Sequence, residues 1–452
     1  MRTTIKPLTV ALACAVATSV AHGVSWAAPR RVWTSALETT VQIERERLAL
    51  RILSSSPMQQ ELRKVEALYA ADAQGSTLAG RATIERAAKA ITLAAVNYAV
   101  GEDSSRPAAF WCCNAPHRWA GLDVPRSGYG IDNPDNVYRL ITFDGNARYE
   151  IRGKVKSPGP AEEHFDLRAG LPGTGPMTNE GGNLLAGLRS DQLTIAADGA
   201  FTITLDKDPA NGRRNHIQLP PQDGLHMTVR DLFTDWATQN PVSLEVRRLG
   251  PPPVTPPRTE AELTARAVKI LSQIAPYWVK YDNQFIFSKP VNIVSEPRVR
   301  GVGRGMSAGG HFQLADDEAL VITLDPLGAR SLGIQLTDPW GVAYEYVDRT
   351  SSLNNVQAKP NSGGTYTFAI SARDPGVYNW LDPEGFSGGI VAARWQSLPA
   401  NADPTRAVRD VRVVKLSALR QALPPETRFV TSAEREAQHL ERSRSYARRF
   451  TQ

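Results

Sequence analysis

Most of the residues that could carry chemistry lie between positions 340 and 380. Tyr346 or Asp374 could move a proton, and Arg349 could orient a carboxylate or an oxyanion, so these three are the candidate catalytic residues. Aromatic rings beside amide side chains also suit non-catalytic binding of a sugar or an apolar ring. The candidate binding residues of this stretch are Trp340, Tyr344, Asn354, Gln357, Asn379 and Trp380. The alternative is that these residues have a structural role, with the aromatic rings packed in a sandwich core and the polar side chains forming Asx turns.

Further candidates lie in the first half of the chain. The polar run at 132–136 predicts a turn, and its alternative is a loop that presents Asp135, Tyr138 and Arg139 to a cleft. His216 and His226 flank a run of turn residues and could face one side of a sheet as two metal ligands. No third ligand at suitable spacing supports them, so we favour packing or hydrogen-bonding histidines and keep His216 as a binding candidate. We predict no metal and no organic cofactor.

Ser307 lies between Gly305 and Gly309, a spacing that matches the nucleophile elbow of hydrolases. That elbow requires a sharp strand-to-helix turn, whereas the run at 311–314 that follows Ser307 is typical of a strand. We therefore favour a glycine-rich β loop over a hydrolase nucleophile.

The predicted strands that must position these residues occur in two similar copies along the sequence. Residues 141–151 match residues 322–334, residues 199–205 match residues 364–370, and residues 227–230 match residues 390–394, the last pair being apolar runs that end in arginine. Three matches in the same order predict a duplicated module. Short β-prone runs separated by Gly, Pro, Asn and Asp predict that each copy is a β-sandwich or jelly roll.

Helices flank the two modules, so the predicted fold is mostly β with flanking helices (α+β). Ser35 with Glu38, Thr259 with Glu262, and Thr431 with Glu434 are capping boxes that begin helices, and Pro276 is expected to end the second of these. The predicted divisions are a signal peptide (1–27), a helical N-terminal segment (28–105), a first β module (106–250), a Pro-rich linker with a helix (251–290), a second β module (291–400) and a helical basic tail (401–452).

The N-terminus predicts export. Arg2 and Lys6 precede an apolar stretch at 8–20, and Ser25 and Ala27 are the small residues that signal peptidase requires. No later stretch is long and apolar enough to span a bilayer. After cleavage, two adjacent cysteines remain, at 112 and 113, which could form a vicinal disulfide, stay as buried thiols or pair between chains.

The composition is that of a globular protein, with 42% hydrophobic and 22% charged residues and a net charge of +6. The densest basic cluster is in the tail and consists of Arg435, Arg442, Arg444, Arg448 and Arg449. We interpret it as a solvated helix face; the alternative is a surface for anionic envelope polymers or lipid headgroups. Because aromatic residues do not alternate with the basic ones, nucleic acid is not an expected partner.

Motifs of both modules resemble a known family. The second module contains Thr-Asp-Pro-Trp-Gly at 337–341 and Asn-Trp-Leu at 379–381, followed by Gly-Gly-Ile-Val-Ala-Ala-Arg-Trp at 388–395; the first contains Asp-Asn-Pro-Asp-Asn-Val-Tyr-Arg at 132–139. Together these resemble the bacterial domain-of-unknown-function family 1214. The resemblance covers the second module well and the first more loosely. It implies a β-rich fold and no agreed reaction, substrate or cofactor.

Two function hypotheses follow. The first is an exported protein of the periplasm or cell exterior that binds an amphiphilic or carbohydrate-like envelope compound, a small molecule, glycan or lipid. The second is a cofactor-independent lyase, isomerase or hydrolase that uses Tyr346, Arg349 and Asp374 in a cleft of the second module. An enzyme would bring at least two of these within hydrogen-bond reach of one another in a concave pocket.

Overall fold

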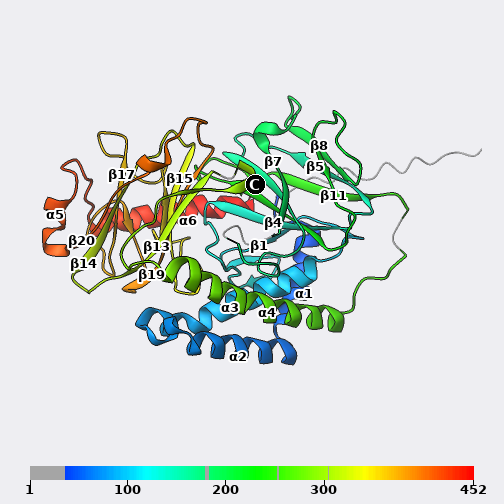
Figure 1. Cartoon of the computed structure of the whole chain (residues 1–452), viewed down its shortest axis with the longest axis horizontal. Helices are drawn as coiled ribbons and strands as arrows, with labels where there is room; N and C mark the ends of the chain where they lie inside the picture. The colour runs from blue at the N-terminus through cyan, green and yellow to red at the C-terminus, as the bar shows by residue number, and fades with distance from the viewer. Residues whose placement is uncertain (1–35, 179–182, 252–253, 304, 452) are drawn as a thin grey trace, which may run out of the picture. The chain divides into compact units, whose positions relative to one another are not determined.

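A computed structural model describes residues 36–451, apart from residues 179–182, 252–253 and 304. These residues fall in one compact unit, Thr34–Gln452 (Figure 1). The expected signal peptide and Ser35 of the first capping box lie outside the described residues. Within the described part, none of the helices combines the length and the apolar character that a membrane crossing requires.

Each β module is a pair of sheets. In module 1 the five-stranded sheet has the order β1 (Phe110–Cys112), β4 (Asn136–Phe143), β10 (Leu225–Leu232), β6 (Glu162–Arg168), β7 (Leu184–Arg189); the four-stranded sheet has the order β11 (Ser243–Leu249), β5 (Arg148–Lys154), β8 (Ala200–Asp206), β9 (His216–Gln218). The short strands β2 (His117–Trp119) and β3 (Leu122–Val124) pair with each other.

Module 2 repeats this arrangement. Its five-stranded sheet has the order β12 (Arg298–Val299), β13 (Met306–Gln313), β19 (Gly388–Gln396), β15 (Ser331–Thr337), β16 (Ser352–Asn354); its four-stranded sheet has the order β18 (Trp380–Leu381), β17 (Tyr366–Ile370), β14 (Glu318–Leu324), β20 (Val408–Lys415). The five-stranded sheets have the same strand order, and so do the four-stranded sheets when the second is read from β20 to β18. In this correspondence β5, β8 and β9 are equivalent to β14, β17 and β18, and in both copies one pair is parallel, β8 with β9 and β17 with β18. The prediction of two tandem related β modules is confirmed.

The equivalent strands also test the three sequence matches. Residues 199–205 and 364–370 fall on the equivalent strands β8 and β17, and the arginine-ending runs fall on β10 and β19. Residues 141–151 fall on β4 and β5, whereas residues 322–334 fall on β14 and β15, which are one strand further along. That match is offset because two hairpins of similar alternation are indistinguishable without their neighbours.

Alternation along the strands separates the module cores from the outer faces of the five-stranded sheets. On β10, Met227 and Val229 point into the module 1 core, and on β19, Val391 and Trp395 point into the module 2 core. The residues between them therefore point outward, toward the other module and the helices. The predicted glycine-rich element at Ser307 is part of strand β13, not a strand-to-helix turn.

Four helices lie side by side along the two modules (Figure 1): α1 (Thr40–Leu53), α2 (Ser56–Ala71), α3 (Leu78–Gly101) and α4 (Glu260–Asp282). The capping box of Thr259 and Glu262 is confirmed by both of its reciprocal hydrogen bonds. Pro276 does not end α4, because burial of Ala275 and Trp278 in the helical core outweighs the one backbone bond that proline cannot make. The helix continues into a π-helical turn, η3 (Asn283–Phe287).

The C-terminal region differs from a purely helical tail. After the helical turn η5 (Pro404–Arg406), β20 completes the four-stranded sheet of module 2, so this module extends past residue 400. The short helix α5 (Leu419–Ala422) follows, and then α6 (Ser432–Thr451), which begins at the capping box of Thr431 and Glu434. The other short helical turns are η1 (Ala73–Ser76), η2 (Ser190–Gln192), η4 (Gly301–Gly303) and η6 (Leu416–Ala418).

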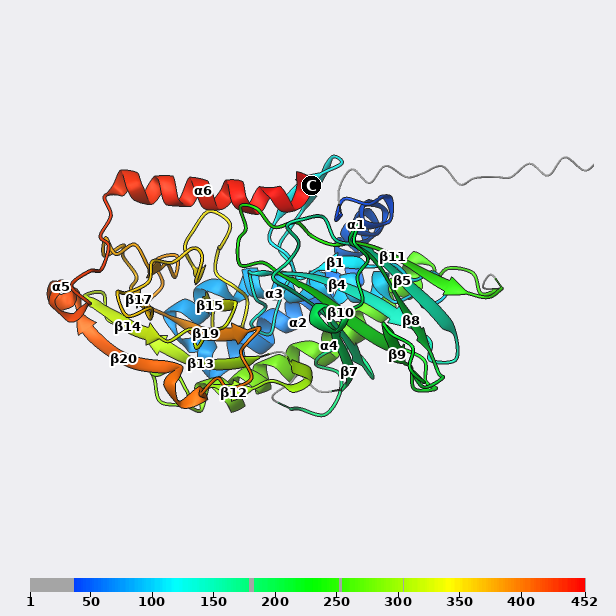
Figure 2. The same cartoon turned by 90° about the horizontal axis from the view of Figure 1, so that it is seen from above.

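Helix α6 runs along both modules (Figure 2) and carries three buried arginines. Arg435, Arg442 and Arg449 are seven residues apart, so they share one helix face, and they are 5%, 6% and 5% exposed. The interpretation of these three as a solvated face is wrong. A basic helix normally faces water, but here each guanidinium finds acceptors and an aromatic ring beneath the helix.

The three arginines attach α6 to both modules. Arg435 pairs with Asp374 of module 2 at 2.9 Å, whereas Arg449 donates to the Pro134 carbonyl of module 1 at 2.9 Å. Arg442 lies between them: it donates to the Tyr346 carbonyl of module 2 at 2.6 Å and covers the Trp236 ring of module 1 at 4.3 Å. We call α6 with these three arginines the strap.

One carboxyl is buried between the helices and module 2. Asp282, the last residue of α4, is 1% exposed, and neither of its oxygens has a hydrogen-bond partner among the described residues. Burial raises its pKa well above the ordinary value, and the nearby carboxyls of Asp338 and Asp72 raise it further. Folding therefore favours the neutral form of the Asp282 carboxyl.

We expect Arg442→Ala to lower the free energy of unfolding by about 2–4 kcal/mol, because it leaves buried carbonyl and hydroxyl acceptors without a donor. Arg444→Ala, on the exposed face of the same helix, should change it by less than about 0.5 kcal/mol. Urea unfolding followed by circular dichroism measures both, and equal losses would contradict the strap.

Asp282→Asn should remove a pH-dependent loss of stability. Because the folded pKa lies above the unfolded value of about 3.9, the stability linked to Asp282 is complete below that value and is lost as the pH rises toward the folded pKa. In that window the variant should gain about 1.4 kcal/mol per pH unit relative to the native chain. Unfolding free energies from about pH 5 to about pH 8 test this, with exposed Asp316→Asn as the control. A difference that is constant with pH would refute it.

Candidate functional site

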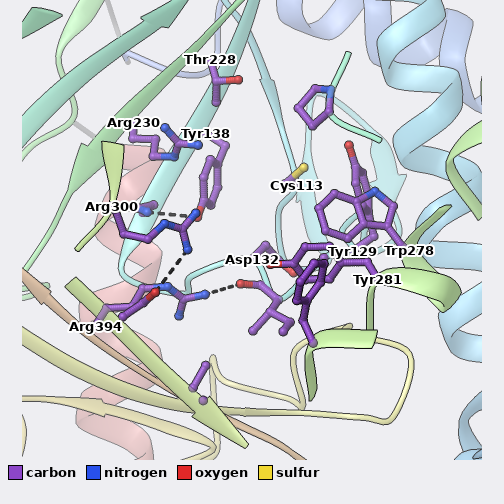
Figure 3. Close-up of a pocket in the computed structure, with 18 of the residues that line it drawn as sticks. Cys113, Tyr129, Asp132, Tyr138, Thr228, Arg230, Trp278, Tyr281, Arg300 and Arg394 are labelled. Carbon is purple, nitrogen blue, oxygen red and sulfur yellow. Dashed lines mark hydrogen bonds between the residues drawn. The ribbon is translucent and has the colours of Figure 1, made fainter. Parts of the chain in front are cut away.

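A cavity of about 230 Å³ lies where the two modules and α4 meet (Figure 3). Its walls are the outer faces of both five-stranded sheets, the α4–η3 segment, and the loop that precedes β4. Seven of the described lining residues are basic, and one, Asp132, is acidic. The basic residues are Arg139, Arg168, Arg230, Lys289, Arg298, Arg300 and Arg394. The cavity therefore carries an excess of positive charge.

Two of the arginines occupy equivalent places in the duplicated modules. Arg230 points outward from β10 and Arg394 from β19, the central strands of the two five-stranded sheets. Arg230 is paired with the carboxylate of Asp166 on β6. At the equivalent place on β15 stands Gln335, whose side-chain oxygen accepts a hydrogen bond from Arg394. The arginine of module 1 is thus neutralised by its strand neighbour, whereas the arginine of module 2 has a neutral one.

A third arginine stands between these two. Arg300 reaches the cavity from the chain after β12 and donates to the Ser307 hydroxyl at 3.3 Å (Figure 3). Burial lowers its pKa, and the positive charge of Arg230 lowers it further. For Arg394, burial is again the main cause of a lowered pKa, and Arg300 adds to it. The three guanidinium groups repel one another across one cavity, and a bound anion would relieve that repulsion.

The opposite wall is aromatic. Trp278, Tyr281 and Phe285 follow one another along α4 and η3, with ring centroids 5.0 Å and 4.9 Å apart. Tyr129 stands against Trp278 at 5.4 Å (Figure 3). The indole N–H of Trp278 is buried and has no partner among the described residues. A flat apolar group would find three or four rings to contact here.

The loop that precedes β4 crosses from module 1 to module 2. Ile131 has φ +61°, which a β-branched residue rarely adopts. Its N–H donates to the Gly341 carbonyl at 2.8 Å, and its carbonyl accepts from Arg394. Gln335 donates to the Asp132 carbonyl at 2.7 Å. Module 2 thus holds this strained segment at several points.

Asp132 is the acidic group of the cavity. Burial raises its pKa to about 7, although Arg126 and Arg394 act in the opposite direction. One of its carboxyl oxygens is buried without a hydrogen-bond partner among the described residues. Asp132 therefore changes charge near neutral pH.

The two cysteines also lie at this cavity. Cys112 and Cys113 are free thiols, and Cys113 has φ +54°. A hydrogen bond with the Cys112 thiol, followed by burial, raises the Cys113 pKa well above its ordinary value. The Tyr98 and Tyr129 hydroxyls are hydrogen-bonded to each other beside them. Cys112 is buried and Cys113 is partly exposed, and the two do not form a vicinal disulfide in the structure.

The three candidate catalytic residues are not brought together around this cavity. Asp374 pairs with Arg435 of the strap, and Arg349 pairs with Asp382 at 2.9 Å. Tyr346 is buried against the Tyr446 ring of α6 at 5.7 Å. Among the described residues none of the three lines the cavity. Their catalytic role stays a prediction without support from a shared pocket.

Most of the candidate binding residues use their polar groups inside the protein. Trp340 stacks on Tyr69 at 4.3 Å and donates to the Gly80 carbonyl, and Tyr344 donates to the Gly388 carbonyl at 2.7 Å. The other contacts are from Asn354 to Asp135, from Arg442 to Gln357, from Asn379 to the Lys359 carbonyl and from Trp380 to the Ser371 carbonyl. The cluster therefore joins module 2 to the helices, the strap and the first module.

Tyr138 and Arg139 do line the cavity. The Tyr138 hydroxyl accepts hydrogen bonds from the Asn133 N–H and from the Asn136 side chain, both at 3.0 Å. Arg139 is bonded to buried Asp231. Tyr138 thus reaches the cavity from β4, and the acid that the polar loop at 132–136 contributes is Asp132. Asp135 instead accepts from Trp236 and Asn354.

His216 and His226 do not share a sheet face. His216 on β9 belongs to the four-stranded sheet and bonds Thr204 at 2.9 Å, whereas His226 on β10 belongs to the five-stranded sheet and lies 3.5 Å from Glu102. The run of turn residues between them carries the chain from one sheet to the other. Within the described residues, no three His, Cys, Asp or Glu side chains are grouped as a metal site would require.

Sequence reasoning missed Asp132, Trp278, Tyr281, Arg300 and Arg394 as site residues. For Arg394 a signal existed, because the arginine that ends the apolar run recurs in both modules. A sequence signal also existed for the outer face of β6, because ionisable residues alternate there with residues of the module core. The ionisable residues are Glu162, His164, Asp166 and Arg168, and all four are buried.

A solved structure shows the fold. An uncharacterised protein from Burkholderia cenocepacia matches with a TM-score of 0.66 and 24% identity, over 82% of this chain and 99% of that one. A protein from Vibrio parahaemolyticus matches with a TM-score of 0.38 and 11% identity, over 63% of this chain and 90% of that one. The comparison with curated proteins gives no match. Residues 139–234 match the family described as protein of unknown function DUF1214, which confirms the predicted resemblance to that family. The match lies in module 1, whereas the resemblance was expected to be stronger in module 2.

Proposed function

We propose that the cavity between the modules binds a small amphiphilic organic anion, with its charged group at Arg300 and Arg394 and its apolar body against Trp278 and Tyr281. The observation that carries the proposal is the pairing of a cationic wall with an aromatic wall around one cavity. Such a space suits a few precisely placed polar groups and an apolar body, as in most small-molecule sites.

The charge of the cavity favours one of the two ligand classes considered from the sequence. A neutral carbohydrate would leave the repulsion among Arg230, Arg300 and Arg394 in place, whereas an anion would relieve it. Charged hydrogen bonds to guanidinium groups are also about twice as strong as neutral ones. An amphiphilic anion is therefore favoured over a carbohydrate.

The size of the cavity limits the ligand. A space of about 230 Å³ exceeds the ~150 Å³ that accommodates benzene in an engineered cavity. A single aromatic ring with a short acidic chain therefore fits, whereas a lipid or an extended glycan does not fit entirely. The predicted export would place such a compound outside the cytoplasm.

Hydrocinnamate, an aromatic acid, and its uncharged amide test this proposal by calorimetry. We expect the acid to bind and the amide to bind at least about tenfold more weakly, because a charged hydrogen bond contributes about 1.5–3 kcal/mol. Affinity for the acid should also fall as salt is added. Equal affinity for acid and amide would sink the proposal.

Two substitutions should each weaken the binding of hydrocinnamate, one by removing a positive charge from the cavity and the other by neutralising it. Arg394→Gln removes the guanidinium, and Gln335→Asp gives it the acidic neighbour that Arg230 already has in module 1. Each should lower the affinity for hydrocinnamate at least about tenfold. Arg330→Gln, exposed in the same module, is the control and should leave the affinity unchanged. Native-like affinity in both cavity variants would exclude Arg394 from the site.

A further inference from the structure

Asp132 stands out because an anion-binding cavity has no evident use for a carboxylate. Among the described residues that line the cavity it is the one acidic group, and it weakens the attraction for an anion. Its buried oxygen without a hydrogen-bond partner adds a desolvation cost. A group that costs both binding and stability needs another explanation.

The backbone at this place is also strained and firmly held. The left-handed conformation of Ile131 costs on the order of 1–3 kcal/mol and persists because module 2 fixes the segment through Gly341, Gln335 and Arg394. Asn133 adds a bond of 3.3 Å to Gln396. Asp132 is therefore held in one place relative to the arginines of module 2.

We infer that Asp132 is a proton acceptor and that the cavity carries out proton transfer on a carbon beside a carbonyl group of its anionic ligand. This activity rests on the proposed function, because the arginines must first hold the acid. It is a cofactor-independent isomerisation, the reaction class considered from the sequence, but in another cavity and with another residue.

The step balances without a further reactant. The Asp132 carboxylate takes a proton from a carbon beside a carbonyl group, and the C–H electron pair forms a carbon–carbon double bond. The carbonyl electron pair moves to the oxygen, and the resulting enolate lies beside Arg300 or Arg394, which stabilise its negative charge. The proton on Asp132 then returns to the oxygen, giving the enol, or to carbon, giving the ketone.

The surroundings of Asp132 suit this role. Arg126 and Arg394 face it with positive charge and Asp338 with negative charge, while Cys113 and Tyr346 are the neutral titratable groups that sense it. Together with burial they give Asp132 a pKa of about 7. A base whose pKa is close to the working pH combines a large ionised fraction with useful basicity.

Phenylpyruvate in heavy water is the probe, because it is an aromatic acid with an exchangeable proton beside a carbonyl. Proton NMR follows the replacement of its benzylic protons by deuterium, and calorimetry with hydrocinnamate follows binding separately. We expect the native protein to accelerate exchange, with a rate that rises with pH through about 7 as Asp132 ionises.

Asp132→Asn should lower the catalysed exchange at least about hundredfold while hydrocinnamate binds as tightly as before or more tightly, because the repelling carboxylate is gone. A merely structural residue would instead weaken both. Asp338→Asn is the matched control: Asp338 is also a buried acid with a raised pKa, about 6, but it does not line the cavity, and its two backbone donors can bond the amide oxygen. It should retain the exchange rate that the native protein reaches well above pH 7 and move only the pH midpoint downward, because Asp338 raises the Asp132 pKa.

The outcomes separate the two proposals. Exchange that persists in Asp132→Asn, or a native protein that binds hydrocinnamate without accelerating exchange, overturns proton transfer and leaves anion binding standing. A native protein that does not bind hydrocinnamate overturns both.

Discussion

The structure depends on burying the polar outer faces of two sheets against each other. Each five-stranded sheet has one face in its module core, so its other face must meet the neighbouring module. On β6 this face consists of every second residue of the strand, and all four are ionisable and buried: Glu162, His164, Asp166 and Arg168. Burying such groups costs several kcal/mol each unless they are paired. The pairing of Arg230 with Asp166 offsets part of this cost, and the remaining unbalanced charge makes the cavity cationic.

The elements that hold the modules together are also the elements that shape the cavity. Trp278 belongs to the helical core and to the aromatic wall, so the packing of α4 fixes the position of that wall. The strap joins the modules from another direction through Arg442 and Arg449. Stability and ligand binding are thus coupled, because a change that loosens the contact between the modules also widens the site.

The repeated strand pattern can be recognised in the sequence, and the fold class follows from it. Alternation of apolar and polar residues, turn residues and helix caps each involve residues close together in the sequence, so the two modules and the capping box at Thr259 could be predicted. The site could not, because Trp278, Arg300 and Asp132 come from three distant segments that only the docking of the modules brings together. Arg442 was misread for a related reason. A basic helix has the same pattern whether water or an aromatic ring lies beneath it.

The difference between the two copies of the module explains why one cavity has a charged and a neutralised side. The duplicated arginines Arg230 and Arg394 occupy equivalent places, but the neighbour of the first is Asp166 and that of the second is Gln335. With acids at both places, the arginines would only stabilise the interface. With glutamine at one place, that arginine can bind an external anion. Asp132, presented by the loop of module 1, lies on this same side. Duplication therefore supplies the walls, and one departure from symmetry supplies the chemistry.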